Sequence, residues 1–177
     1  MKQIRSLAAL TQTAMVAALY AVLTFVLPVA SFGTLQCRFS EALTALPVVS
    51  RRAIAGLTLG CAIANAIGVA MGANIAGIWD ILVGSAATLL AAWLSFLCRR
   101  IRIKGIPWLS LLWPVAVNAV IIGAELTLVT LGSWQWSGWC LFAAQVALGE
   151  LIPSVAGGIL LVKALENTRW GSSIFGE

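Results

Sequence analysis

Apolar segments long enough to cross a lipid bilayer dominate the chain. The first runs from about residue 7 to residue 30, and a transmembrane helix needs about 20 mainly apolar residues. Hydrophobic residues make up 61% of the 177 residues, and 11 Lys and Arg with 6 Asp and Glu are too few to cover a soluble fold. The sequence therefore predicts an all-α membrane protein and excludes a cytosolic enzyme.

We expect a single membrane domain over residues 1–177, folded as a compact bundle of six transmembrane helices. The predicted spans are approximately residues 7–30, 41–50, 53–71, 79–98, 107–131 and 138–165. The second is short, because its residues make only about 15 Å of helix, and its full crossing of the bilayer is left open. Residues 166–177 are expected to form a polar cytoplasmic tail.

The distribution of basic residues predicts the orientation, because Lys and Arg concentrate in cytoplasmic loops. With six spans, both termini share one side with every Lys and Arg except Arg38. If the short second element only dips into the membrane and returns, five spans place Lys2 and Arg5 on the outer side and the other Lys and Arg residues, Arg38 included, on the cytoplasmic side. The six-span arrangement divides the Lys and Arg residues more unevenly between the two sides of the membrane. Six spans with cytoplasmic N- and C-termini are therefore favoured.

The sequence lacks the motifs of most enzymes and cofactor-binding proteins. It contains no histidine, which excludes His-ligated zinc and serine–histidine pairs. Its four cysteines form no CxxC pair, so no metal site is predicted; buried apolar roles are favoured, with a Cys37–Cys140 disulfide as the alternative. The basic residues form no continuous stripe, which disfavours a nucleic-acid partner. No GxxxxGK[ST] loop occurs, so an ATPase activity is not encoded.

Four carboxylates lie within or at the ends of predicted spans, where a charge is costly unless it is paired or hydrated. Glu41 and Asp80 begin spans at the predicted outer face. Glu125 lies toward the outer end of the fifth span, and Glu150 lies near the middle of the sixth. The only nearby cation is Arg38, so the pattern predicts an outward-facing cavity for a ligand that is cationic or rich in hydrogen-bond donors.

Amide and aromatic side chains are further candidates for ligand contact. Asn118 and Glu125 are about two helical turns apart, which places an amide and a carboxylate on one face. Asn65 and Gln145 place amides in other spans, where they contact a ligand or join helices. Four tryptophans cluster at the predicted outer ends, where a planar ring can stack on one of them. An anchoring belt at the membrane surface is favoured for Trp134, Trp136 and Trp139, whereas both interpretations stay open for Trp79, which adjoins Asp80.

Some of these residues also have structural interpretations. Asp80 and Glu41 lie at helix starts, where an acidic side chain can cap the helix. Arg38 lies three positions before Glu41 and either contacts the ligand or pairs with that carboxylate. Glu125 and Glu150 lie too far inside their spans to cap a helix, so ligand contact is the favoured interpretation of both.

Small residues at four-residue spacing allow close helix packing in two spans. In the third span, the series from Gly56 to Gly72 indicates packing inside the bundle. In the first span the small residues are all alanines, which fit either internal packing or a docking surface for another membrane protein: Ala14, Ala17, Ala18 and Ala21.

Five segments in this order and spacing resemble the QueT family, the queuosine-precursor members of the substrate-binding S components of energy-coupling factor (ECF) transporters. They are RFSEALTALP (38–47), GLTLGCAIAN (56–65), WDILVGSAATL (79–89), NAVIIGAEL (118–126) and GE (149–150). The resemblance implies a six-helix, multi-pass subunit in the plasma membrane of a prokaryote. It also implies a transmembrane coupling subunit and two cytoplasmic ATPase subunits as partners. The chain itself would hold no cofactor, and its partners would use the ATP.

The ligand implied by the resemblance is preQ1, 7-aminomethyl-7-deazaguanine, or a close precursor. Glu125 and Asn118 are assigned to its guanine-like edge, and Trp79 to its ring. The ammonium group is left to one of three carboxylates: Glu41, Asp80 or Glu150. Arg38 and Asn65 complete the candidate site. Family members contact the coupling subunit through an alanine-spaced first helix, and Ala17 and Ala21 match that pattern best.

Two other functions stay open at this point. One is an S component for another vitamin or nucleobase. The other is an autonomous proton-coupled carrier of cationic compounds, with Glu125 or Glu150 as its proton site. A membrane enzyme is disfavoured, because the sequence contains no nucleophile–base or metal constellation.

Overall fold

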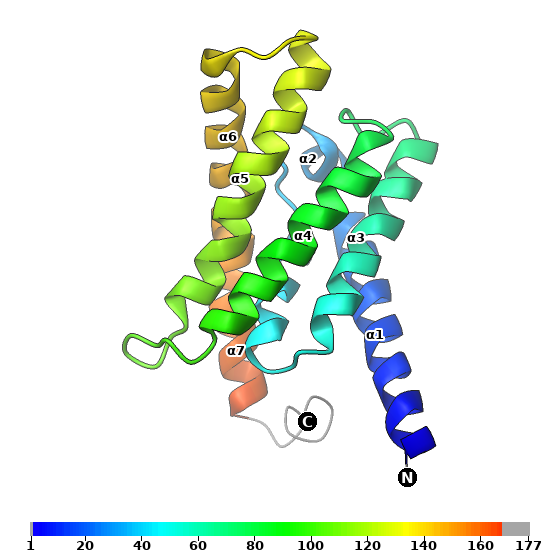
Figure 1. The fold of residues 1–177 in the computed structure, drawn as a ribbon, viewed down its shortest axis with the longest axis vertical. Coiled ribbons are helices and arrows are strands. Elements are labelled where there is room, and N and C mark those ends of the chain that lie inside the picture. Colours follow the sequence, from blue (N-terminus) through cyan, green and yellow to red (C-terminus); the bar gives the residue numbers. More distant parts are fainter. Residues whose placement is uncertain (1, 168–177) are drawn as a thin grey trace.

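The computed structural model describes residues 2–167, which form a bundle of helices joined by short loops (Figure 1). No β-strand occurs in this range, which confirms the all-α prediction. The elements are α1 (Lys2–Thr24), α2 (Pro28–Phe32), a 3-10 helix η1 (Phe39–Val48), α3 (Ala53–Ala70), α4 (Trp79–Cys98), α5 (Trp108–Leu131), α6 (Trp136–Leu151), a π-helix η2 (Ile152–Gly157) and α7 (Gly158–Glu166).

Within residues 2–167, five helical stretches are long and apolar enough to cross a membrane. They are Leu7–Thr24, Ala53–Ala70, Trp79–Cys98, Trp108–Leu131 and Trp136–Glu166. The chain returns between α2 and α3 through residues 33–38 and η1, so that the start of α1 and the end of α7 lie at the same end of the bundle (Figure 1). At about 2.0 Å per residue, η1 is too short to cross the hydrocarbon layer alone. The sixth crossing and the cytoplasmic position of the termini remain predictions, and residues 168–177 of the predicted tail lie outside the described residues.

The first helix ends earlier than the apolar pattern predicts. Helix α1 stops at Thr24, and α2 begins at Pro28, whereas the sequence predicts one span to residue 30. A proline disfavours the helical conformation at the residue before it, and Leu27 has φ −134° and ψ 77°. The turn before Pro28 therefore divides the apolar run into a long helix and a short one.

Glycines allow α3 to pack closely against α1. A Cβ atom added to Gly56 would lie 2.7 Å from the Cβ of Val16, and one added to Gly60 would lie 2.7 Å from the Cβ of Tyr20. Carbon atoms in van der Waals contact lie about 3.5–4.0 Å apart, so a larger residue at either position would push the helices apart. The predicted internal packing of the third span is confirmed at these two glycines.

The same contact corrects the interpretation of Ala17 and Ala21 as a docking surface. Their exposed fractions are only 2% and 8%, and a Cβ on Gly60 would lie 2.9 Å from the carbonyl oxygen of Ala17. Small residues suit close packing on either side of a helix, and here α3 covers this pair. Ala14 and Ala18 are the exposed members of the series.

The segment between α2 and η1 carries polar residues into the bundle. It passes so close to α6 that a Cβ on Gly149 would overlap the carbonyl oxygen of Leu35. Gln36 has a left-handed backbone conformation with φ 52°, and the Cys37 N–H donates to the carbonyl oxygen of Ala30 at 2.9 Å. Non-helical backbone is tolerated at membrane depth only where protein groups satisfy it or water reaches it. The close approach at Gly149 therefore positions the residues that follow.

Helices α6 and α7 are joined without a break by η2, which contains Pro153. The Ser154 hydroxyl in this wide turn donates to the carbonyl oxygen of Leu111 on α5 at 3.1 Å. Beyond the turn, Val162 of α7 is only 3% exposed and packs with Val48 of η1 and with Leu111. The π-helix thus aligns α7 with η1 at the end of the bundle opposite α2.

Candidate ligand-binding site

A buried ion pair ties the segment before η1 to the start of α4. An Nη atom of Arg38 lies 3.3 Å from Asp80 Oδ2. The Arg38 Nε donates to the carbonyl oxygen of Ser31 at 2.9 Å, and the same Nη donates to Gln36 Oε1 at 2.5 Å. Asn74 Nδ2 donates to Asp80 Oδ2 at 2.8 Å. Arg38 and Asp80 are both buried, so each depends on the other for charge compensation.

This pair corrects the predicted partner of Arg38, which is Asp80 and not Glu41. Asp80 makes no capping hydrogen bond for α4. Its second oxygen, Oδ1, lies so close to Gly84 that an added Cβ there would overlap it. Asn65 Nδ2 donates to the Asp80 carbonyl oxygen at 2.8 Å. These contacts give Asp80 and Asn65 a role in holding α3, α4 and the Arg38 segment together.

Glu41 lies in a second polar cluster, between α1 and η1. The Tyr20 hydroxyl donates to Glu41 Oε1 at 2.6 Å, and the Thr24 hydroxyl donates to the Ser40 hydroxyl at 2.8 Å. Both Tyr20 and Glu41 are buried, and Glu41 Oε2 has no hydrogen-bond partner within residues 2–167. Glu41 is therefore an interior carboxylate and not a group at the outer surface.

A third polar cluster joins α5 to α6. In it Asn118 contacts Glu150 and not Glu125, the residue with which the sequence pairs it. Asn118 Nδ2 donates to both oxygens of Glu150, at 2.8 and 3.0 Å. Both residues are buried, and Asn118 Oδ1 has no partner in the described part of the chain. Because the amide donors point to Glu150, the predicted amide–carboxylate pair on α5 is replaced by a pair between two helices.

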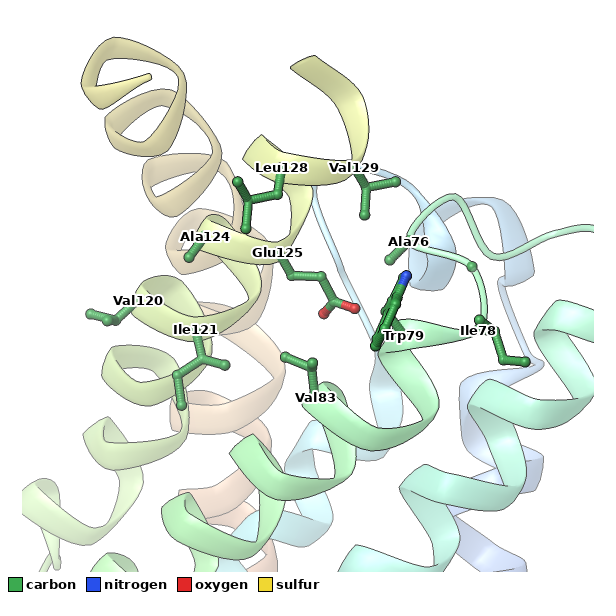
Figure 2. Close-up of a pocket in the computed structure, with 11 residues that line it drawn as sticks. Ala76, Ile78, Trp79, Val83, Val120, Ile121, Ala124, Glu125, Leu128 and Val129 are labelled. Atoms are coloured by element: carbon green, nitrogen blue, oxygen red, sulfur yellow. The ribbon is translucent and has the colours of Figure 1, made fainter. Parts of the chain in front are cut away.

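A cavity of about 870 Å³ lies between the start of α4 and the second half of α5. Figure 2 shows the carboxyl group of Glu125 directed from α5 toward Trp79 on α4. Glu125 is only 6% exposed, and neither of its oxygens has a partner in the described residues. Trp79 is 62% exposed, and its ring forms part of the wall. The rest of the lining is apolar: Ala76, Gly77, Ile78, Val83, Val120, Ile121, Ala124, Leu128 and Val129.

The cavity brings together Trp79 and Glu125 but not the other predicted aromatic residues. Three tryptophans after the end of α5 contact one another with ring centroids 5.2–6.2 Å apart, and none of the three lines this cavity. They are Trp134, Trp136 and Trp139. A planar ring against Trp79 would have Glu125 within the same cavity. An aromatic contact and a carboxylate are suited to a flat, apolar ligand that carries hydrogen-bond donors.

Polar atoms without partners in the described interior are mostly acceptors. Seven are carbonyl or carboxylate oxygens, from Glu41, Asn65, Asp80, Asn118, Gln145 and both oxygens of Glu125. The others are the Ser31 hydroxyl and Gln36 Nε2. Buried acceptors are costly without donors, so this interior complements a ligand that supplies N–H groups.

Several residues of the buried polar clusters were not predicted from the sequence, among them Tyr20, Asn74 and Gln36. Tyr20 is the only tyrosine of the chain and lies in an alanine-rich helix, a signal that marks it for a polar contact. Asn74 and Gln36 lie in loops, where a polar side chain is unremarkable without its Asp80 and Arg38 contacts. All four cysteines are free, so Cys37 and Cys140 do not pair.

A model of the QueT transporter family matches residues 10–167, nearly all of the described chain. The chain belongs to the QueT transporter family. It is a membrane transport protein and not an enzyme, in agreement with its five long apolar helices. Searches of curated proteins and of solved structures gave no match.

Proposed function

We propose that this QueT-family protein is the substrate-binding S component of an ECF transporter and captures preQ1 outside the cell. The observation that carries the proposal is the apolar cavity that contains Trp79 and the unpartnered carboxylate of Glu125. PreQ1 has a flat ring, several N–H donors and an aminomethyl group that is cationic at neutral pH. Each of these features has a counterpart in the cavity or in the acceptor-rich interior beside it.

The charge balance of the interior supports a cationic ligand. Among the residues whose burial the structure describes, four carboxylates and one cation are buried, and the cation, Arg38, is paired with Asp80. A ligand that brings one positive charge would reduce this imbalance, whereas an anion would increase it. The balance therefore also favours preQ1 over its nitrile precursor, preQ0.

The energy for uptake is proposed to come from partner subunits in the plasma membrane of a prokaryote. The sequence contains no phosphate-binding loop, so a transmembrane coupling subunit and two cytoplasmic ATPases would supply ATP hydrolysis. With Ala17 and Ala21 buried, the exposed side of α1 around Ala14 and Ala18 is the proposed contact with the coupling subunit. Six crossings with cytoplasmic termini fit this arrangement.

The test is binding of preQ1, preQ0, queuine, guanine and riboflavin to the purified protein, measured by calorimetry and tryptophan fluorescence. We expect preQ1 to bind tightly without ATP and more tightly than guanine. Trp79→Phe serves as a control for the fluorescence signal, since the protein has eight tryptophans and Trp79 is the one within residues 2–167 that lines the cavity. Failure of a folded sample to bind any 7-deazaguanine would refute the proposal, and tight riboflavin binding would assign the protein to another vitamin.

A further inference from the structure

The four buried carboxylates differ in which neighbouring groups already offset their charge or donate hydrogen bonds to them. Asp80 has the Arg38 guanidinium and an Asn74 amide. Glu150 receives two hydrogen bonds from Asn118. The remaining two are Glu41, which has one short hydrogen bond from the Tyr20 hydroxyl, and Glu125, which has none from the described residues.

The four carboxylates also differ in whether they line the cavity, where a ligand could reach them. Glu125 is the one that lines the large cavity, and its carboxyl group is directed into the space beside Trp79 (Figure 2). The unpartnered oxygen of Asp80 instead faces Gly84, with no room for even a methyl group between them. A ligand in the cavity therefore meets Glu125 first, and Asp80 is closed to it.

We infer that Glu125 is the ammonium-binding group of the site, and that it makes the protein select a planar heterocycle with a primary amine. This inference rests on the proposed function and changes the assignment of Glu125, which the sequence links to the guanine-like edge. The Asn118–Glu150 pair, with its unpartnered Asn118 Oδ1, is left for the edge of the ring.

The selectivity follows from the apolar walls around Glu125. A protonated amine donates a charge-assisted hydrogen bond to the carboxylate and neutralises it. A nitrile at the same position has no donor, so its binding would leave a charged group buried and unpartnered. We expect the wild-type protein to bind preQ1 about 10- to 100-fold more tightly than preQ0, the range of one charge-assisted hydrogen bond.

The experiment compares the preQ1-to-preQ0 affinity ratio in wild-type protein, Glu125→Gln, Glu125→Asp and Glu150→Gln, by calorimetry on detergent-purified samples. Glu125→Gln should bring the ratio close to 1 by weakening preQ1 alone, because glutamine keeps the shape and removes the charge. Glu125→Asp should keep most of the preference. Glu150→Gln makes the same chemical change at the pair assigned to the edge of the ring. PreQ1 and preQ0 share this edge, so any loss of affinity should fall on both compounds and leave their ratio unchanged.

Each outcome separates this inference from the proposed function. If wild-type protein binds preQ1 tightly and Glu125→Gln keeps the ratio, the inference is wrong and the proposed function stands. Loss of the ratio in Glu150→Gln would likewise move the ammonium to that carboxylate. If folded wild-type protein binds neither compound, the proposed function fails and the inference fails with it. Thermal unfolding of each variant shows that the compared samples are folded.

Discussion

Replacement of Asp80 by asparagine should strongly destabilise the protein, because it leaves the Arg38 charge buried without its counter-ion. Removing one partner of a buried ion pair costs about 3–5 kcal/mol. Here the contact is a single one at 3.3 Å, and Arg38 keeps two neutral acceptors, the Ser31 carbonyl and Gln36 Oε1. The lower end of the range, about 3 kcal/mol, is therefore expected.

Removal of the other partner, in Arg38→Met, should lower the unfolding free energy by about as much, because the Asp80 carboxylate would retain only the hydrogen bond from Asn74. The double variant loses both charges together and should cost about 3–4 kcal/mol instead of the sum of about 6, a coupling of about 2–3 kcal/mol. Reversible unfolding in mixed micelles, followed by tryptophan fluorescence, gives the four free energies.

An exposed ion pair provides the matched control for this cycle. Arg102 donates two hydrogen bonds to Glu166, and about a third of each side chain is exposed. An exposed pair contributes about 0–1 kcal/mol, so the cycle of Arg102→Met and Glu166→Gln should show little coupling. Two results would refute the assignment of Arg38 and Asp80 as a buried ion pair. One is that the losses of unfolding free energy in the two single variants add up in the double variant. The other is that each single variant loses as little unfolding free energy as the control variants do.

Two further predictions concern packing. Gly84→Ala should lower the unfolding free energy by about 1–3 kcal/mol, because the added methyl group overlaps the carboxylate of the buried ion pair; unchanged stability in the same unfolding assay would contradict this. Ala17→Leu should lower the melting temperature of the purified protein because Gly60 lies against Ala17, whereas Ala18→Leu on the exposed side should not. Equal melting temperatures of the two leucine variants would argue against the α1–α3 contact.

The helical class and its long apolar helices could be predicted because each depends on local composition. A run of apolar residues indicates a membrane helix whatever surrounds it, so the sequence predicts the helices at Ala53–Ala70 and Trp79–Cys98. The end of α1 at Thr24 is also a local effect of Pro28, but a prediction based on hydrophobicity alone misses it because the apolar run continues past the proline. The span boundary at residue 30 was wrong for that reason.

The partners of the polar residues could not be predicted, because they join elements distant in sequence. Arg38 and Asp80 are 42 positions apart, and Asn118 and Glu150 are 32 apart. The sequence places each residue on a helix or in a loop but does not fix how the helices rotate against one another. It therefore favoured the nearest candidates, Glu41 for Arg38 and Glu125 for Asn118.

The side of α1 that carries Ala17 was ambiguous for a related reason. In a membrane, both lipid-facing and protein-facing sides of a helix are apolar, so hydrophobicity does not distinguish them. The glycines of α3 hold the missing information, since Gly56 and Gly60 need a close neighbour. The structure is needed to match Gly56 to Val16, and Gly60 to Ala17 and Tyr20.

The π-helix between α6 and α7 sets the rotational phase of the last helix. A deletion of one residue from Ile152–Gly157 would turn α7 by about 100° relative to α6. Val162 would then leave its packing against η1 and face the lipid, while neighbouring side chains rotated inward. Single-residue insertions or deletions in this turn should therefore disrupt the packing of α7 against η1, although they leave the composition of the chain almost unchanged.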